Sequence, residues 1–495
     1  MIEFVLNDQN ISTDLPPGLT VLDFVRYRQN LKGTKIGCRE GDCGACTILV
    51  GELVGDSVKY RSMTSCLMPL ANAQGKHIVT VEGINPEDGS LTPVQQAMVD
   101  ESGTQCGFCT VGFVMSLTGF CIDETEKTPE MAVSAVDGNI CRCTGYKSIE
   151  RAAAEVSRQL AEGRRQSEPG SLPYEGVVPE YFSTITKRLA NLKSAAIRTE
   201  TRPVGSVSFV GGGTDVYVQH PDVMSEAEAM HLFFEDDLRG IRNTGDFIEM
   251  GASTSVTDLL VSPVMQSIFP NLYKHLKLIS STPIRNMATL AGNFVNASPI
   301  GDMTVWFLAL DAEITLSSPP CLGGVAEGRG GSSDRTIPLR DLYLGYKRLA
   351  KSDDEIITAI RFRKPSGDFR FNFEKVCKRT YLDIATVNTA ISIQLARPEP
   401  DHGPPIPEFL ESAIRNPQSK IESAHVAAGG VSPIPLYLKE TSAFLVGKEV
   451  TEESISQANE IMQAEISPIS DVRGTEVYKR LLLKQLFKAH FVEMF

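Results

Sequence analysis

The 495-residue sequence lacks the features of membrane, secreted and nucleic-acid-binding proteins. No apolar run reaches the roughly 18 residues that a transmembrane helix needs. The N-terminus, MIEFVLNDQNIS, has neither a basic segment nor a long apolar core, so it is not a signal peptide. Positive charge is scarce: 48 Lys and Arg against 61 Asp and Glu give a net charge of −13. This balance argues against nucleic acid or a membrane surface as a partner.

Cysteine is rare in the C-terminal two thirds of the chain, where only Cys321 and Cys377 occur. Eleven cysteines without a secretory signal indicate a cytoplasmic protein, in which disulfides are uncommon. The others are Cys38, Cys43, Cys46, Cys66, Cys106, Cys109, Cys121, Cys141 and Cys143. In a reducing compartment, such crowding favours metal binding over disulfides.

The first group of cysteines has the spacing of a plant-type [2Fe–2S] site. Cys38, Cys43 and Cys46 stand at C-x4-C-x2-C, and Cys66 follows. Glycines 37, 41 and 44 allow tight or left-handed backbone and let N–H groups approach the sulfur atoms. A structural zinc site is the alternative, but zinc loops rarely use this spacing.

The second group is Cys106-x2-Cys109 followed by Cys141-x-Cys143. The spacing alone leaves an iron–sulfur cluster and a zinc ion both open. Each pair lies beside glycines at the expected end of a helix, where amide dipoles favour anionic thiolates. This neighbourhood favours a second cluster. The three other cysteines, Cys121, Cys321 and Cys377, are expected to be small buried hydrophobic residues.

The pattern of apolar residues predicts a multidomain α+β protein. Residues 1–82 form a small α+β unit that opens with a strand, in which Ile2, Phe4 and Leu6 share a face. Residues 83–161 contain four short helices, and the first is capped by Thr92. Residues 162–176 form a Pro- and Gly-rich linker. Mixed strand and helix patterns then predict domains over 177–370 and 371–495.

A glycine-rich stretch, FVGGGTDV at 209–216, predicts a strand, a loop and a turn or helix. Small residues there let several N–H groups approach the oxygens of a diphosphate. An ordinary glycine-rich turn explains the stretch equally well. It is not the G-x-G-x-x-G dinucleotide pattern.

The cysteine motifs, IGCREGDCGAC, SCL, QCGFCT and GNICRCTGY, resemble the iron–sulfur module of the molybdenum hydroxylases, the xanthine dehydrogenase and aldehyde oxidase group. The resemblance implies a β-grasp ferredoxin-like domain followed by a four-helix bundle, each with a [2Fe–2S] cluster. It assigns Cys38, Cys43, Cys46 and Cys66 to the first cluster and Cys106, Cys109, Cys141 and Cys143 to the second. Gln105 and Cys143 match positions that touch the pterin of the molybdenum cofactor in relatives.

The remainder also resembles this family. FVGGGTDV and TLAGNFVNASPIGD (289–302) look like the two FAD segments of a vanillyl-alcohol-oxidase-type (PCMH) domain. CKRTYLDIA and ISPISDVRGTEVYKRLLLKQLF resemble the ends of a CO-dehydrogenase-flavoprotein-like C-terminal domain. Lys378 matches a flavin-side lysine, although a solvated strand charge is the alternative. The FAD contacts that the resemblance implies are Phe209, Val210, Gly211, Gly212, Gly213, Thr214, Asp215, Val216, Thr289, Gly292, Asn293, Asp302 and Lys378.

The order of two cluster domains and an FAD domain in one chain resembles the small subunit of bacterial xanthine dehydrogenases. The chain stops at Phe495 without a molybdopterin domain. We therefore expect a molybdopterin-binding large subunit, in a heterotetramer of two small and two large subunits, and NAD as electron acceptor. No catalytic residue is expected on this chain. An aldehyde or N-heterocycle hydroxylase subunit is the main alternative. A freestanding NADH-dependent reductase has less support, because the R-x-Y-S/T motif of such reductases is missing from the sequence. A non-enzymatic zinc scaffold is the last alternative.

Overall fold

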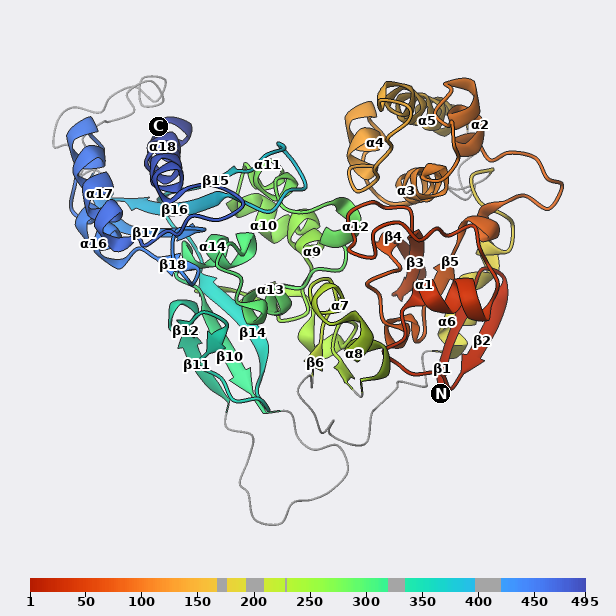
Figure 1. The fold of residues 1–495 in the computed structure, drawn as a ribbon, viewed down its shortest axis with the longest axis horizontal. Coiled ribbons are helices and arrows are strands. Elements are labelled where there is room, and N and C mark those ends of the chain that lie inside the picture. Colours follow the sequence, from red (N-terminus) through yellow and green to blue (C-terminus); the bar gives the residue numbers. More distant parts are fainter. Residues whose placement is uncertain (167–175, 193–208, 228, 319–333, 397–419) are drawn as a thin grey trace, which may run out of the picture.

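The computed structural model describes residues 1–166, 176–192, 209–227, 229–318, 334–396 and 420–495 (Figure 1). The chain passes from a first domain and a helical domain, red and orange in Figure 1, through a green third domain to a blue C-terminal domain. Among the described residues, no helix is long and apolar enough to cross a membrane.

The first domain is a five-stranded sheet in the order β2-β1-β5-β3-β4. Its strands are β1 (Ile2–Leu6), β2 (Gln9–Thr13), β3 (Thr47–Val54), β4 (Ser57–Thr64) and β5 (His77–Val79). Strands β1 and β5 pair in parallel, whereas the other pairs are antiparallel. Ile2, Phe4 and Leu6 are all buried, as the sequence predicted. They pack with a short helical segment made of α1 (Val21–Asp23) and the π-helical turn Phe24–Arg28.

The helical domain contains the four predicted helices, α2 (Pro93–Asp100), α3 (Thr110–Ile122), α4 (Pro129–Ala135) and α5 (Lys147–Gln166). Thr92 caps α2 in a capping box with Gln95, as predicted. Helix α3 is apolar on every side and is buried along almost its whole length. It therefore forms the centre of the domain, and the cysteine pairs lie in the loops at one end of these helices.

The segment after the helical domain returns to the first domain. Helix α5 continues to Gln166, so it enters the predicted linker 162–176, whose residues 167–175 lie outside the described residues. Helix α6 (Phe182–Leu192) packs Ile185 and Leu189 against Val5 of β1. The Arg188 guanidinium also lies 2.6 Å from the carboxylate of Asp8. Helix α6 is thus attached to the first domain, although the sequence grouped it with the third.

The third domain has a five-stranded antiparallel sheet in the order β11-β10-β14-β9-β8. Its strands are β8 (Ile241–Asn243), β9 (Phe247–Gly251), β10 (Glu313–Ser317), β11 (Arg335–Pro338) and β14 (Ile356–Arg363). Two small pairs accompany it: β6 (Phe209–Val210) with β7 (Met230–His231), and β12 (Tyr343–Gly345) with β13 (Arg348–Leu349). Its helices are α7 (Val216–Gln219), α8 (Pro221–Glu226), α9 (Val256–Val261), α10 (Pro263–Ile268), α11 (Leu272–Lys277), α12 (Thr282–Arg285), α13 (Leu290–Asn296) and α14 (Asp302–Leu308).

The C-terminal domain is an antiparallel sheet in the order β15-β16-β17-β18, covered by helices. Its strands are β15 (Asp368–Val376), β16 (Val387–Leu395), β17 (Ile421–Gly429) and β18 (Leu436–Tyr437). Its helices are α16 (Lys439–Leu445), α17 (Glu452–Glu465) and α18 (Glu476–Met494).

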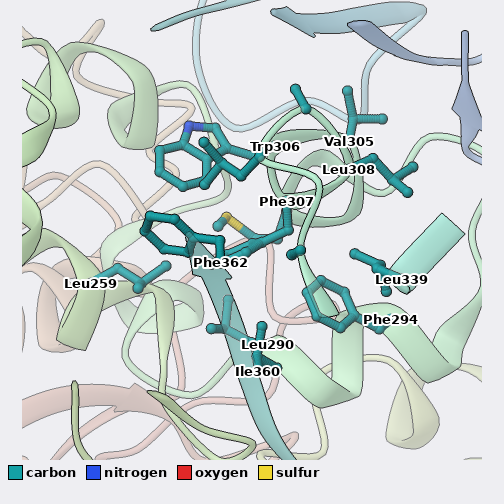
Figure 2. Close-up of a cluster of buried hydrophobic side chains, with 14 of the residues drawn as sticks. Leu259, Leu290, Phe294, Val305, Trp306, Phe307, Leu308, Leu339, Ile360 and Phe362 are labelled. Atoms are coloured by element: carbon teal, nitrogen blue, oxygen red, sulfur yellow. The ribbon is translucent and has the colours of Figure 1, made fainter. Parts of the chain in front are cut away.

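The third and C-terminal domains share one hydrophobic core. Figure 2 shows its centre, where Trp306 and Phe307 of α14 meet Phe362 of β14. The same cluster includes buried Phe373 of β15, and the Trp306 ring lies 4.6 Å from that of Phe371. The strands of the C-terminal sheet thus complete the burial of α14.

Candidate cofactor sites

The loop that carries Cys38, Cys43 and Cys46 lies between the π-helical turn and β3, and Cys66 follows β4. The N–H groups of Glu40 and Cys43 point at the Cys38 sulfur, at 3.3 and 3.4 Å. The pKa of the Cys38 thiol is lowered to about 5, because the Cys43 thiol and these N–H groups donate to it. A thiol that ionises at neutral pH is the form that ligates iron.

Cys46 and Cys66 form the buried half of this set. The pKa of Cys46 is lowered because the Cys66 thiol donates a hydrogen bond to it. Both thiols also interact electrostatically with Cys38, so the four predicted ligands converge from the loop and the end of β4. Gly37 allows this close approach, because a Cβ there would lie 2.5 Å from the Cys43 sulfur.

The second set of cysteines has one pair in the α2–α3 loop and the other pair in the α4–α5 loop. The sulfur atoms of Cys106 and Cys143 are 3.6 Å apart, and both residues are exposed. Cys141 is buried, and its sulfur lies 3.2 Å from the Thr144 hydroxyl. Burial and a hydrogen bond with Cys141 raise the pKa of Cys109 to about 12. The thiols stand as facing pairs, Cys106 with Cys143 and Cys109 with Cys141.

The three remaining cysteines differ in how well the prediction of burial holds. Cys121 is buried in α3, and burial raises the pKa of its thiol to about 12, as expected of an inert hydrophobic residue. The prediction that Cys377 is buried is wrong. The residue is partly exposed, because it begins the turn after β15. Its thiol donates a hydrogen bond to the Arg379 carbonyl at 2.7 Å. Cys321 lies outside the described residues.

The glycine-rich loop lies between β6 and α7, and two of its glycines approach other backbone segments so closely that a side chain would not fit there. A Cβ on Gly212 would lie 1.8 Å from the Met287 carbonyl oxygen. Gly213 has a φ of +84°, and its Cβ would lie 2.5 Å from the Leu67 carbonyl oxygen. Among the described residues, none accepts a hydrogen bond from the N–H groups of Gly212, Gly213 or Thr214. A cradle of free N–H groups suits an anionic diphosphate, so the loop fits the predicted FAD.

The second predicted FAD segment lies directly against this loop. Thr289 caps α13 by accepting from the Gly292 N–H at 3.1 Å, and a Cβ on Gly211 would lie 2.8 Å from the same hydroxyl. Asn293 of α13 accepts from the Thr304 N–H at 3.0 Å, which ties α13 to the start of α14 at Asp302. Two stretches that are about 80 residues apart in sequence thus lie side by side, as a single FAD site would require.

Asp302 is engaged by a lysine that sequence reasoning missed. The Lys375 ammonium group lies 2.7 Å from one Asp302 oxygen, and Asn388 donates to the other at 2.5 Å. The Lys375 side chain is only 1% exposed. Lys378 instead lies exposed in the turn after β15, and its predicted role at the flavin stays a prediction. Strand alternation would have marked position 375 as inward-facing, but nothing in the sequence identified Asp302 as its partner.

Four family models match successive parts of the chain. They describe a 2Fe-2S iron-sulfur cluster binding domain (4–71), a [2Fe-2S] binding domain (80–154), an FAD binding domain in molybdopterin dehydrogenase (187–365) and a CO dehydrogenase flavoprotein C-terminal domain (373–494). The predicted fold class, the two [2Fe–2S] clusters and FAD are thereby confirmed.

Curated relatives include a xanthine dehydrogenase of Emericella nidulans, 27% identical over 91% of this chain and 35% of the relative. Xanthine dehydrogenase 1 of Arabidopsis thaliana is 25% identical over 98% of this chain and 39% of the relative. Aldehyde oxidase 4 of Cavia porcellus is 27% identical over the same shares. The chain thus spans well under half the length of these curated relatives.

Among solved structures, a carbon monoxide dehydrogenase from Hydrogenophaga pseudoflava is similar, with a TM-score of 0.47 and 25% identity. The match covers 58% of this chain and 88% of that chain. Four consecutive domain matches and relatives that align with almost the whole chain agree with the cysteine and FAD motifs. The chain belongs to the molybdenum hydroxylase family, as an iron–sulfur and FAD-binding chain of that family.

Proposed function

We propose that this chain is the electron-transfer subunit of a cytoplasmic xanthine dehydrogenase. In this proposal a molybdopterin-binding large subunit oxidises xanthine, and this chain passes the electrons through its two cluster domains to FAD and then NAD. Two copies of each subunit form the complex. The similarity to curated xanthine dehydrogenases over almost all of this chain supports the proposal.

The observation that carries the proposal is the spatial order of the predicted cofactor ligands. Cys106 and Cys143 are exposed at the outer end, where a partner subunit has access. The Ile140 N–H, next to Cys141, donates to the Cys43 carbonyl at 3.0 Å and so joins the second set to the first. Gly213 of the diphosphate loop lies against Leu67, which follows Cys66. These contacts support a continuous series that runs from the surface through the two cysteine sets to the glycine-rich loop.

The residues of this chain hold the cofactors and set their surroundings. When bound, iron–sulfur clusters carry single electrons, whereas FAD stores two and releases them as a hydride. N–H groups directed at Cys38 stabilise added negative charge on the first set. The N–H groups of residues 212–214 would hold the FAD diphosphate, and the Lys375–Asp302 pair holds the start of α14 against β15.

A subunit of an aldehyde or N-heterocycle hydroxylase is the second candidate, since aldehyde oxidase 4 of Cavia porcellus is as similar to this chain as the first xanthine dehydrogenase. In either case the substrate would be selected on the large subunit. A freestanding reductase has less support, because it gives no role to the second cluster domain.

The test compares the purified chain with the complex formed by co-expression of a molybdopterin subunit. The chain alone, with flavin and iron bound, should reduce an artificial dye with NADH and should not oxidise xanthine. The complex should oxidise xanthine faster than aldehydes. Xanthine turnover by the molybdenum-free chain would overturn the proposal. Failure to oxidise NADH at full flavin content would show that NAD is not the acceptor.

A further inference from the structure

Residues 137–140, which we call the junction, connect α4 to Cys141 and touch three domains. Asn139 and Ile140 contact the loop that carries the first set of predicted ligands, so the inference rests on the cluster assignment in the proposed function. The junction belongs to the helical domain, yet the Asp137 carboxylate, the Asn139 side-chain N–H and the Ile140 backbone N–H all bond outside that domain.

Asp137 fixes the junction to the third domain. Its carboxylate lies 2.7 Å from the Arg285 guanidinium and 3.2 Å from the Lys277 ammonium group. It also accepts from the Thr282 N–H at 2.7 Å. Arg285 is itself buried and held in place by the carbonyl groups of Ile279 and Ser280. Burial alone would raise the pKa of Asp137, but the charges of Arg285 and Lys277 lower it, so the carboxylate is ionised.

Asn139 fixes the junction to the first domain. Its side-chain amide donates to the Gly44 carbonyl at 3.1 Å and accepts from the Ser116 hydroxyl of α3 at 2.7 Å. Gly44 has a φ of +67°, and a Cβ there would lie 2.3 Å from the Gly138 carbonyl oxygen. The two loops are therefore in direct contact, with no room for a side chain between them.

The backbone completes the connection. The Ile140 N–H donates to the Cys43 carbonyl at 3.0 Å, so one hydrogen bond and one peptide unit separate Cys43 from Cys141. Because both loops are held at this point, a shift of the junction moves the two sets of predicted ligands relative to each other.

We propose that Asp137 and Asn139 are positioning residues that fix the separation and orientation of the two cluster-binding loops. Asn139 acts directly, through Gly44 and Ser116. Asp137 acts through Arg285, which makes docking of the third domain part of the same arrangement. The spacing of the clusters thus depends on all three domains.

The test is the magnetic interaction between the two reduced clusters, measured by low-temperature electron paramagnetic resonance of the complete chain. We expect the wild type to show two signals that split each other. Asn139→Ala should lose or alter this splitting while iron and sulfide stay at wild-type levels. Asp137→Asn, which lies four residues before Cys141 and keeps the side-chain shape, should alter it to a smaller extent.

The matched control is Asn459→Ala. Asn459 is also buried and donates to a backbone carbonyl, that of Lys484 at 3.0 Å, but it lies in α17 of the C-terminal domain. This variant should keep the wild-type splitting. Unchanged splitting in both Asn139→Ala and Asp137→Asn would overturn this proposal alone. If Asn139→Ala loses a cluster, the splitting measured in Asp137→Asn decides whether the proposal holds. A wild type with fewer than two signals would overturn the cluster assignment and this inference with it.

Discussion

At the residue scale, Cys46 and Cys66 are the most deeply buried thiols of the first set. Cys46→Ser should remove the first cluster, because a hydroxyl does not replace a thiolate ligand. Iron and acid-labile sulfide should each fall from about four to about two per chain, since each cluster holds two irons. Cys121→Ser changes an equally buried cysteine of α3 and should leave both counts unchanged. Full iron content in Cys46→Ser would show that Cys46 is not a ligand of the first cluster.

Gly212 decides whether the loop at 209–216 can bind a diphosphate. Gly212→Val places a side chain where only 1.8 Å separates a Cβ from the Met287 carbonyl oxygen, so the loop must move. We expect loss of most of the FAD absorbance, with both clusters retained. Gly345→Val makes the same change in open space within the same domain and should keep FAD. Flavin retention in Gly212→Val would show that the loop is an ordinary turn and does not bind the diphosphate.

Single residues also show where sequence reasoning stops. The spacing of Cys38, Cys43 and Cys46 could be interpreted from the sequence, because ligand spacing within one loop is a local property, and the assignment of all eight cysteines to clusters stays a prediction. The Lys375–Asp302 pair could not be predicted, since it depends on how β15 packs against α14, 73 positions earlier. Cys377 was misjudged for a similar reason: whether a turn residue is covered depends on its distant neighbours.

At the scale of elements, α18 carries a buried histidine into the C-terminal sheet. His490 accepts from the Asn372 amide at 3.0 Å. Burial, with the charge of His275, lowers its pKa to about 3, below the usual value of about 6.5. The unfolded chain therefore binds a proton that the folded chain excludes, and stability falls as pH falls from about 6.5 towards 3.

This shift corresponds to about 2 kcal/mol of unfolding free energy at pH 5. His490→Gln should therefore flatten the acid side of a plot of unfolding free energy against pH, as measured by urea denaturation. His220→Gln alters an exposed histidine and should leave that slope as in the wild type. A wild-type slope in His490→Gln would show that other groups cause acid unfolding.

Element types were more predictable than element limits. The four helices of the second domain appear where the apolar pattern and the Thr92 cap placed them. Helix α4 ends at Ala135, and beyond it the side chains of Asp137 and Asn139 bond to other domains. Contacts of this kind come from distant parts of the chain, so local periodicity does not reveal them.

At the scale of the whole molecule, exposed apolar residues surround the outer cysteine pair. Phe108, Ile140 and Tyr146 are 47%, 37% and 40% exposed. We expect this surface to dock on the large subunit. Phe108→Asp should lower the amount of large subunit that co-purifies, by pull-down at equal iron content. Val472→Asp changes a more exposed residue of the C-terminal domain and should have no effect. Undiminished co-purification of Phe108→Asp would place the interface elsewhere.

The attachment of α6 to the first domain has a consequence for how such a chain can be divided into two polypeptides. The Pro- and Gly-rich stretch before α6 is the obvious place to separate an iron–sulfur half from a flavin half. A break there would place Ile185, Leu189 and Arg188 on a different polypeptide from the first-domain residues that they contact. A break between Leu192 and Phe209 would instead keep α6 in the same polypeptide as the sheet that it packs against. Gene fission or fusion in this lineage should therefore favour the later position.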